Sequence, residues 1–380
     1  MTIEIIKDQF KKIYSAEPLL FRSPGRINLI GEHTDYNEGF VLPAAIDKAI
    51  FIAAGKRNDN EIHLYSQDFN ESFSTTISDV KPVKSWATYI LGVVSQLQQA
   101  GYEVKGFNMV MGGDVPIGAG LSSSAAVECA TAYALNELFG FGIEKMQMVK
   151  MAQKAEHEFA GVKCGIMDQF ASMFGQKEHV MKLDCRSLEF EYFPLEMKDV
   201  KIVLLDTQVK HSLASSEYNV RRSQCEEGVA AIQKKHPGVN SLRDATLEML
   251  DEAVPAGTMV HNRCKYVIEE KERLLKGCED LQNHQLEAFG QKMFATHEGL
   301  SKLYEVSCPE LDYLVDAVKG NPAVLGARMM GGGFGGCTIN LVKKEAIDAL
   351  IEEVSASYEK AMNKNLKAYI VQIEDGTSKF

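Results

Sequence analysis

A glycine- and serine-rich stretch in the first third of the chain carries the residue types that bind phosphate. Residues 113–126 read GDVPIGAGLSSSAA; an alternating apolar run at 107–111 predicts a strand before them, and helical spacing at 127–138 predicts a helix after them. The first turn of a helix leaves backbone N–H groups unpaired and carries a partial positive charge. Gly118 and Gly120 would let the backbone approach a ligand closely. This arrangement predicts a phosphate site.

The common phosphate motifs do not fit this loop. A Walker loop needs Gly-Lys followed by Ser or Thr, and the stretch has no Lys. A dinucleotide fingerprint needs a third glycine where Ser123 stands. From the loop alone, a glycine- and serine-rich helix cap without any ligand remains an equally good interpretation.

A second polar segment follows Pro24 and Gly25, which predict a turn. Side chains of both charges and a histidine stand within ten residues of each other: Arg26, Asn28, Glu32, His33 and Asp35. One interpretation is a solvated surface loop; another is a metal site, although Glu-His-x-Asp lacks the spacing of known zinc motifs. A third is recognition of sugar hydroxyls, because carboxylates accept hydrogen bonds from vicinal hydroxyls and a histidine can add another.

Two carboxylates further along have both a structural and a chemical interpretation. Glu156 lies near the end of a helix predicted over 143–159, where a surface position is the default; a zinc-protease motif is rejected because it needs a second His where Gly161 stands. Asp168 lies in an apolar stretch, residues 164–175. It is expensive to bury unless paired, so it is either a helix N-cap or a base paired with an arginine.

Composition limits the classes of function. The 380 residues suggest two domains, and we place their junction near residue 195. A hydrophobic content of 45% fits a globular protein with a core. The net charge of −11 argues against a nucleic-acid partner. Eight cysteines without a C-x-x-C pair, a polar N-terminal start and no long apolar run predict no membrane partner and a reducing cytoplasm.

The remaining pattern predicts the elements that must hold these groups. Helices are predicted over 4–14, 86–99 and most of 225–320, with another opening near 215, and strands over 46–57, 61–66, 200–206 and, as a closing strand, 368–373. A second glycine cluster, residues 331–336, has five glycines in six positions and precedes an apolar strand. This density predicts a tight loop with close backbone approach rather than a plain hairpin turn.

Taken together, these motifs resemble those of a known family. Residues 24–36 look like the galactokinase signature, and Gly118–Ser124 resembles the ATP motif of the GHMP small-molecule kinases. Residues 331–336 resemble the third motif of that superfamily, and residues 164–170 also match. The motifs occur in the family's order and span the chain, so the sequence is identified as similar to the galactokinase family.

The resemblance implies a fold and an activity. The fold would be α+β, with mixed β-sheets and flanking helices in two lobes and the active site between them; we expect one domain over 1–195 and the other over 196–380. The activity would be phosphorylation of galactose at its anomeric hydroxyl, with ATP and Mg²⁺ and an aspartate base. Galactose and ATP would be the partners of a monomeric chain. Alternatives are a kinase for N-acetylgalactosamine or another sugar, or a sensor that binds sugar and ATP.

The resemblance also assigns roles to individual residues. Asp168 would be the base, and Arg26 would pair with it and stabilise the transferring phosphoryl group. The implied sugar contacts are Glu32, His33, Thr34, Asp35 and Tyr218. The implied nucleotide contacts are Ser66, Gly118, Ala119, Gly120, Leu121, Ser122, Ser123 and Ser124, with Ser124 and Glu156 as Mg²⁺ partners. Because the base, the arginine and the serine loop are all present, the enzyme is favoured over the sensor.

Overall fold

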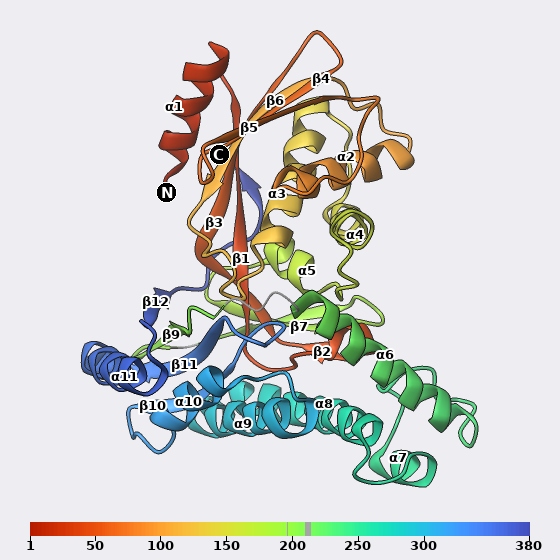
Figure 1. The fold of residues 1–380 in the computed structure, drawn as a ribbon, viewed down its shortest axis with the longest axis vertical. Helices are drawn as coiled ribbons and strands as arrows, with labels where there is room; N and C mark the ends of the chain where they lie inside the picture. The colour runs from red at the N-terminus through yellow and green to blue at the C-terminus, as the bar shows by residue number, and fades with distance from the viewer. Residues whose placement is uncertain (196, 210–213) are drawn as a thin grey trace.

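The computed structural model describes residues 1–195, 197–209 and 214–380. The chain forms two lobes stacked along its long axis (Figure 1). The upper lobe is built on a six-stranded sheet, and the lower lobe combines a four-stranded sheet with long helices. A three-stranded sheet lies near their junction.

The upper sheet has the strand order β13-β1-β3-β6-β4-β5. Its strands are β1 (Leu19–Asn28), β3 (Pro43–Lys56), β4 (Glu61–Ser66), β5 (Glu71–Thr76), β6 (Phe107–Gly113) and β13 (Ser378–Lys379). The pair β4 and β6 is parallel and the other pairs are antiparallel. The sheet is therefore mixed, as predicted.

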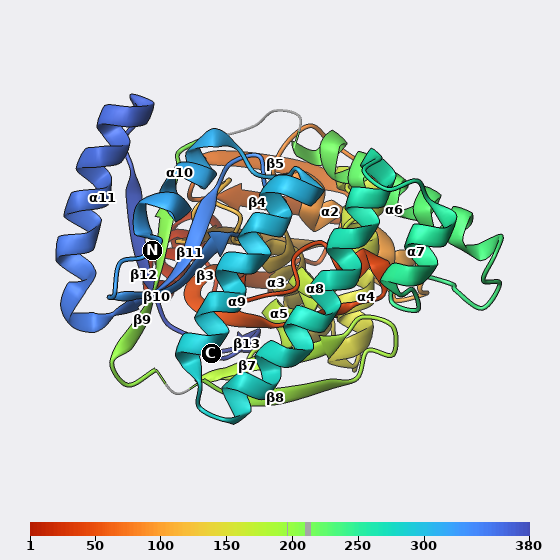
Figure 2. The ribbon, with the colours of Figure 1, turned by 90° about the horizontal axis from the view of Figure 1, so that it is seen from below.

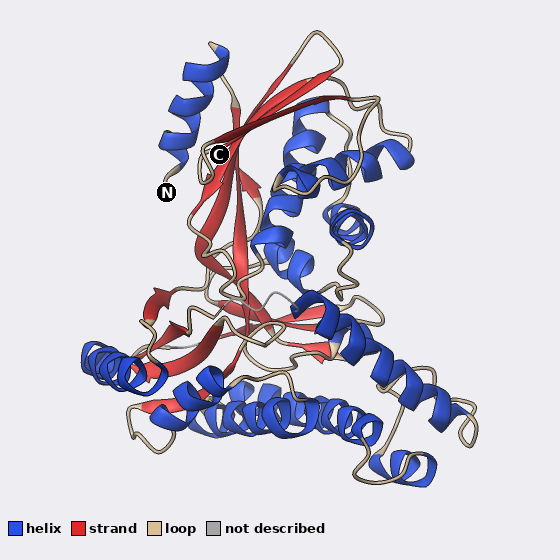
Figure 3. Cartoon of the chain, in the orientation of Figure 1, coloured by secondary structure: helices blue, strands red, loops and turns tan. Residues whose placement is uncertain are grey.

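Helices cover both faces of this sheet (Figure 3). One face carries α2 (Ala87–Gln99), α3 (Ser123–Phe139), α4 (Lys145–Ala155) with its π-helical continuation η2 (Glu156–Ala160), and α5 (Met167–Phe174). The other face carries α1 (Ile3–Tyr14), whose Ile6 and Phe10 pack on Ala53 and Val110. The large core of the lobe lies on the α2–α5 side.

The lower lobe has an antiparallel sheet of order β10-β11-β9-β12. These strands are β9 (Val200–Asp206), β10 (Val324–Met329), β11 (Cys337–Lys343) and β12 (Lys367–Val371). The helices are α6 (Ala214–Gln233), α7 (Leu247–Ala253), α8 (Met259–Gln282), α9 (Leu286–Gly299), the π-helix η3 (Leu300–Tyr304), α10 (Pro309–Val318), the short η4 (Lys344–Ala346) and α11 (Ile347–Met362). Seen from below, α8 and α9 lie side by side (Figure 2).

The third sheet, β2-β7-β8, links the lobes. It comprises β2 (Phe40–Val41), β7 (His179–Asp184) and β8 (Phe190–Pro194), and the short helix η1 (Asp35–Asn37) precedes it. One hydrophobic core includes Ile27 and Leu135 of the upper lobe and Leu274 and Cys337 of the lower lobe. Packing therefore continues across the junction, which fixes the two lobes against each other.

One local prediction was wrong. Pro24 and Gly25 do not form a turn, because both lie inside β1 at a register shift against β3. The irregularity frees the Arg26 N–H to donate to the Leu121 carbonyl (3.1 Å) instead of to the sheet. A Cβ atom at Gly25 would lie 2.8 Å from that same oxygen. The pair therefore marks a bulge that brings β1 onto the phosphate loop.

The chain also ends differently from the expectation. The predicted closing strand, β12, is followed by β13, which pairs with β1 and returns the last residues to the upper sheet. A domain division at residue 195 stays a prediction. Among the described residues, no helix is long and apolar enough to cross a membrane.

Candidate active site

Asp168 is held by two hydrogen bonds from residues of the upper lobe. Arg26 Nε donates to its Oδ1 atom at 2.7 Å, and the Ser122 hydroxyl donates to Oδ2 at 2.5 Å. Arg26 also donates through Nη1 to the Gly120 carbonyl at 2.6 Å. The arginine thus ties the carboxylate to the phosphate loop. Burial alone would lower the pKa of Arg26, but the neighbouring carboxylates outweigh burial and raise it. Each carboxylate oxygen keeps a lone pair that can accept a hydrogen bond from a bound hydroxyl.

The N-cap interpretation of Asp168 is wrong. Helix α5 is capped by Ile166, and Asp168 lies inside its first turn. A negative charge in the first turn interacts favourably with the helix dipole. The side chain points away from the helix and accepts a hydrogen bond from Arg26. The pairing interpretation therefore describes the residue.

The phosphate loop is not an ordinary serine cap. Ser122 occupies the N-cap position of α3 in a left-handed conformation, with φ of 58°, and makes no side-chain cap bond. Its hydroxyl is directed to Asp168 instead. The first turn of this 17-residue helix, with Ser123 and Ser124, faces a pocket. Open N–H groups and the helix dipole make that turn suitable for phosphate.

The second glycine cluster lies directly against this loop. A Cβ atom at Gly331 would be 3.2 Å from the Gly120 carbonyl oxygen, and one at Gly336 would be 3.2 Å from the Ala119 carbonyl carbon. Both glycines have positive φ, at 78° and 79°. The close approach predicted from the glycine density is confirmed, and it closes the site from the lower lobe.

Glu156 is buried rather than on the surface, and it belongs to a carboxylate cluster. The Ser124 hydroxyl donates to its Oε1 at 2.9 Å, and Gln169 donates to its Oε2 at 2.8 Å. The same amide nitrogen of Gln169 donates to Glu128 at 3.1 Å. Burial and the Asp168 charge raise the pKa of Glu156 to about 7. A cation beside these oxygens would hold the carboxylate ionised.

Residues 24–36, which contain four of the predicted sugar contacts and are called the sugar segment below, turn inward at the junction of the two lobes. Glu32 forms a buried ion pair with Arg328 of β10 at 2.7 Å, and Asn28 donates to the same carboxylate oxygen at 3.3 Å. Thr34 donates to the Gly31 and Phe40 carbonyls. Thr34 therefore holds the loop closed.

His33 and Asp35 are the two titratable groups of the segment whose pKa values shift most. Burial lowers the pKa of His33 to about 3, so the ring is neutral. Burial, together with repulsion from Asp168, raises the pKa of Asp35 to about 7. A Cβ atom at Gly165 would lie 1.9 Å from Asp35 Oδ2, so this approach requires glycine.

A pocket of about 200 Å³ collects these side chains. It is lined by Arg26, Glu32, His33, Asp35, Glu156, Val162, Cys164, Met167, Asp168, Tyr218, Gly331 and Gly332. The structure thus brings together the predicted base, its arginine and four of the five predicted sugar contacts. Thr34 is buried behind the lining.

A second pocket of about 650 Å³ lies on the other side of the phosphate loop, which is also called the serine loop below because it contains Ser122, Ser123 and Ser124. Its lining includes Trp86, Tyr89, Val127 and Phe159, together with Ser123 and Ser124. Ser66 does not line it: the residue is fully buried and accepts a hydrogen bond from the N–H of Phe69, which does. The apolar end and the helix N-terminus suit a nucleotide base and its phosphates.

Several residues of the site were not found from the sequence. Arg328 contacts the predicted residue Glu32, and Gln169 contacts the predicted residue Glu156. Glu128 accepts from Gln169, and Cys164 lines the pocket. Arg328 stands next to the second glycine cluster, which was a usable signal. Glu128 lies in a stretch predicted as a helix, and only burial distinguishes it.

Family models and solved structures agree on the class of protein that this fold and site define. Residues 88–176 match the model "GHMP kinases N terminal domain" and residues 278–360 match "GHMP kinases C terminal". The fold is shared with mevalonate kinase of Methanococcus jannaschii, with a TM-score of 0.68, 20% identity, and coverage of 95% of this chain and 99% of that one. The two pockets and the serine loop are thus set in the fold of the GHMP small-molecule kinases.

Closer relatives narrow the class. Residues 8–56 match the "Galactokinase galactose-binding signature". The chain is 44% identical to a galactokinase of Thermotoga maritima, covering 94% of this chain and 99% of the relative, and 39% identical to one of Clostridium acetobutylicum, covering 99% of both. Lactococcus lactis galactokinase, solved with galactose, superposes over 100% of both chains with a TM-score of 0.96 and 33% identity. The chain belongs to the galactokinase family.

Proposed function

We propose that this chain transfers the γ-phosphoryl group of ATP to the anomeric hydroxyl of galactose, giving galactose 1-phosphate and ADP. The observation that supports this most is Asp168, whose carboxylate is fixed by Arg26 and Ser122 in the pocket between the sugar segment and the phosphate loop. A proton acceptor is thus held beside the place where two substrates would meet.

The reaction needs little covalent chemistry from the protein. Asp168 takes the proton of the anomeric hydroxyl while the oxygen of that hydroxyl bonds to the γ-phosphorus of ATP. The bond between the γ-phosphorus and the bridging β–γ oxygen breaks, and the bridging oxygen leaves with ADP. Arg26 stabilises the charge on the transferring group and keeps the base oriented. Glu32, His33, Asp35 and Tyr218 hold the sugar by its hydroxyls.

The carboxylate cluster fits Mg²⁺. Ser124 and Glu156 offer the oxygen ligands that Mg²⁺ prefers. Burial and the charge of Glu156 raise the pKa of the neighbouring Glu128 well above its usual value, so this group of carboxyls lacks positive charge. Ser124 and Glu156 would hold the ion, which when bound neutralises the triphosphate and draws its electrons away from the transferring phosphorus.

The larger pocket would take the nucleotide. Its aromatic and aliphatic lining, which includes Trp86 and Tyr89, suits a purine base. The triphosphate would then run along the N-terminus of α3 toward Asp168, where backbone N–H groups bind phosphate oxygens.

The eight cysteines are all free, which agrees with a reducing cytoplasm.

A panel of sugars tests the proposal. Purified protein with ATP and Mg²⁺ is offered galactose, glucose, N-acetylgalactosamine and other monosaccharides, and sugar phosphate is measured. We expect galactose to exceed glucose in kcat/KM by orders of magnitude, because a site built to hydrogen-bond a hydroxyl leaves buried groups unpaired with the wrong epimer. Equal kcat/KM values would contradict the sugar assignment, and binding without turnover would instead support a sensor. Sedimentation of the same sample tests the expected monomer.

A further inference from the structure

A chain of hydroxyl groups leads from the sugar pocket into the lower lobe. His33 Nδ1 lies 2.8 Å from the Tyr36 hydroxyl, which lies 2.7 Å from the Tyr304 hydroxyl. The Tyr304 hydroxyl in turn lies 3.2 Å from Cys225 Sγ. The four residues come from the sugar segment, η1, η3 and α6, and Tyr304 and Cys225 are buried. None of the last three residues lines the pocket.

The chain of contacts leaves one histidine nitrogen for the pocket. His33 lines the pocket and its Nδ1 is occupied by Tyr36, so Nε2 is the nitrogen available to a ligand. Nε2 is buried and has no hydrogen-bond partner among the described residues. The ring is neutral, so Nε2 either carries the proton and donates, or is bare and accepts.

The direction of the hydroxyl chain decides between these two states. Each hydroxyl has one hydrogen to donate, and a hydroxyl that accepted from both neighbours would leave that hydrogen buried and unpaired, so the favoured arrangements have all three bonds running the same way. If they run toward the histidine, Cys225 donates to Tyr304, Tyr304 to Tyr36 and Tyr36 to Nδ1, and Nε2 carries the proton. If they run the other way, Nδ1 carries the proton and the chain ends on the Cys225 sulfur, which is a weak acceptor.

Two features favour the first direction. The imidazole Nδ1 is a better acceptor than the Cys225 sulfur, so the hydrogens are better paired when the chain runs toward the histidine. The pocket also holds the carboxylates of Glu32, Asp35 and Asp168, which accept when ionised. A sugar hydroxyl that donates to one of them needs a donor for its own oxygen.

We propose that Tyr36, whose oxygen accepts from Tyr304 while Tyr304 accepts from Cys225, is the positioning residue that fixes His33 in the Nε2–H state, so that it donates to a sugar hydroxyl. The tautomer belongs to the free protein and does not depend on catalysis. Its consequence for sugar affinity rests on the proposed function. The two parts can therefore fail separately.

The tautomer is measured by ¹⁵N NMR of the imidazole nitrogens in the free protein. The His33 signal is identified by its loss in His33→Asn, and we expect the pattern of a neutral ring protonated at Nε2. Tyr36→Phe should shift this pattern toward a mixture of tautomers, whereas Tyr304→Phe should retain it, because the Tyr36 hydrogen then has no acceptor in the chain except Nδ1. Tyr358→Phe is the matched control, because it removes a buried hydroxyl that donates to the Thr207 carbonyl, outside the chain. An Nδ1–H pattern in the wild type, or no change in Tyr36→Phe, would overturn the proposal.

Galactose affinity is measured by calorimetry on the same variants. Losing the orientation of one hydrogen bond should weaken binding about five- to tenfold in Tyr36→Phe, and less in Tyr304→Phe. The kcat value should stay within about twofold, because the base is untouched.

Changes at Cys225 test the far end of the chain. Cys225→Ala should retain the wild-type NMR pattern, because the Tyr304 hydrogen then has no acceptor in the chain except Tyr36, while Cys225→Ser, whose oxygen accepts more strongly than sulfur, should shift the pattern toward the Nδ1–H form. Cys264→Ala, in the same hydrophobic cluster, is the matched control. A shifted pattern with unchanged galactose affinity would leave the tautomer assignment intact and overturn the sugar contact.

Discussion

The two pockets on either side of the serine loop are lined by side chains of different chemical character. The sugar pocket measures about 200 Å³ and is lined by an arginine, a histidine and four carboxylates. The nucleotide pocket measures about 650 Å³, and its lining is mostly apolar and aromatic away from the helix N-terminus. Under the proposed function, the first would recognise galactose by buried charge and oriented hydrogen bonds, and the second would recognise ATP by apolar area and a backbone dipole.

This difference implies different tolerances to change. A buried carboxylate that loses its partner pays the cost of desolvation in full, so single changes in the sugar pocket should have large effects. Contact with an apolar surface is spread over many atoms, so single changes in the nucleotide pocket should have moderate effects. The predictions below start with the strongest test of this contrast.

The largest effect should come from Asp168→Asn. The substitution keeps the shape and most hydrogen bonds but removes the proton acceptor, so we expect kcat to fall by about 10²-fold or more, with the fold retained. Rates at saturating ATP and galactose, with a thermal melt of each protein, measure this. Asp114→Asn is the matched control, since that partly exposed aspartate lies outside both pockets. Near wild-type turnover in Asp168→Asn would end the assignment of the base.

Asp35 should make galactose binding depend on pH. Its pKa is raised to about 7, so the carboxylate gains a proton as the pH falls below 7. The ionised form accepts stronger hydrogen bonds from hydroxyls. We therefore expect galactose binding to weaken about tenfold between pH 8 and pH 6, and to release protons near neutrality.

Calorimetry in buffers of different ionisation enthalpy measures the proton release at Asp35. Asp35→Asn should bind galactose weakly at every pH and release no protons. Glu156→Gln is the comparison, because Glu156 also titrates near pH 7 and lines the same pocket. Proton release that vanishes in Glu156→Gln and persists in Asp35→Asn would assign the pH dependence to the wrong carboxylate.

Ser124→Ala tests whether the two pockets act separately. Loss of one oxygen ligand should raise the Mg²⁺ concentration needed for half-maximal activity by about tenfold at most, because water can replace a hydroxyl. Galactose affinity should stay within twofold. Ser123→Ala, one residue earlier in the same helix turn, should change the Mg²⁺ requirement less, since Ser124 is the one of these two serines that bonds to Glu156. Lost galactose affinity with normal nucleotide affinity would contradict the assignment.

Local signals were sufficient for much of this site. The strand–loop–helix around residues 107–139 and the approach of the two glycine clusters follow from spacing and from the conformations that glycine allows. Which residues pair with one another in the site could not be predicted from local signals, because the partners are distant in the chain. Arg328 bonds to the Leu29 carbonyl, 299 residues away, and Tyr304 meets Tyr36 across 268 residues. The bulge at Pro24 was missed because tertiary contact with the loop overrides an ordinary turn signal.

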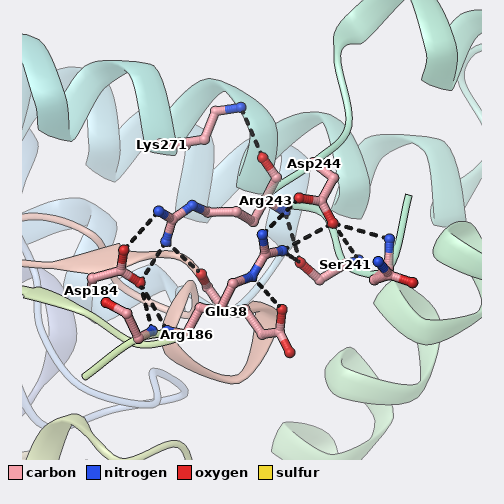
Figure 4. A network of polar contacts seen from close by, with 9 residues as sticks. Glu38, Asp184, Arg186, Ser241, Arg243, Asp244 and Lys271 are labelled. Atoms are coloured by element: carbon pink, nitrogen blue, oxygen red, sulfur yellow. Dashed lines mark hydrogen bonds and ion pairs between the residues drawn. The ribbon is translucent and has the colours of Figure 1, made fainter. Parts of the chain in front are cut away.

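The sugar segment is also anchored from outside the pocket, by a surface network (Figure 4). Arg243 donates to both oxygens of Asp184 at 2.6 and 2.7 Å and to the Glu38 carbonyl at 3.1 Å. Arg186 links the Glu38 carboxylate to Asp244. The Arg243 guanidinium also lies 4.0 Å from the centre of the Phe40 ring. The network thus joins residues 38–40, just after the sugar contacts, to β7 and to the segment between α6 and α7.

Removing this anchor should have the smallest effect of the series. Arg243→Ala leaves every pocket residue in place but frees the end of the segment, so the KM for galactose should rise about two- to fivefold, with kcat and the KM for ATP unchanged. Arg57→Ala is the matched control, because Arg57 bonds to both oxygens of Asp59 in the connection between β3 and β4 of the upper sheet. The partly exposed network is screened by salt, so wild type at high ionic strength should approach the variant. A fall in kcat as large as that of Asp168→Asn would show that the anchor aligns the base as well as the sugar, and the contrast between pocket and surface would then fail.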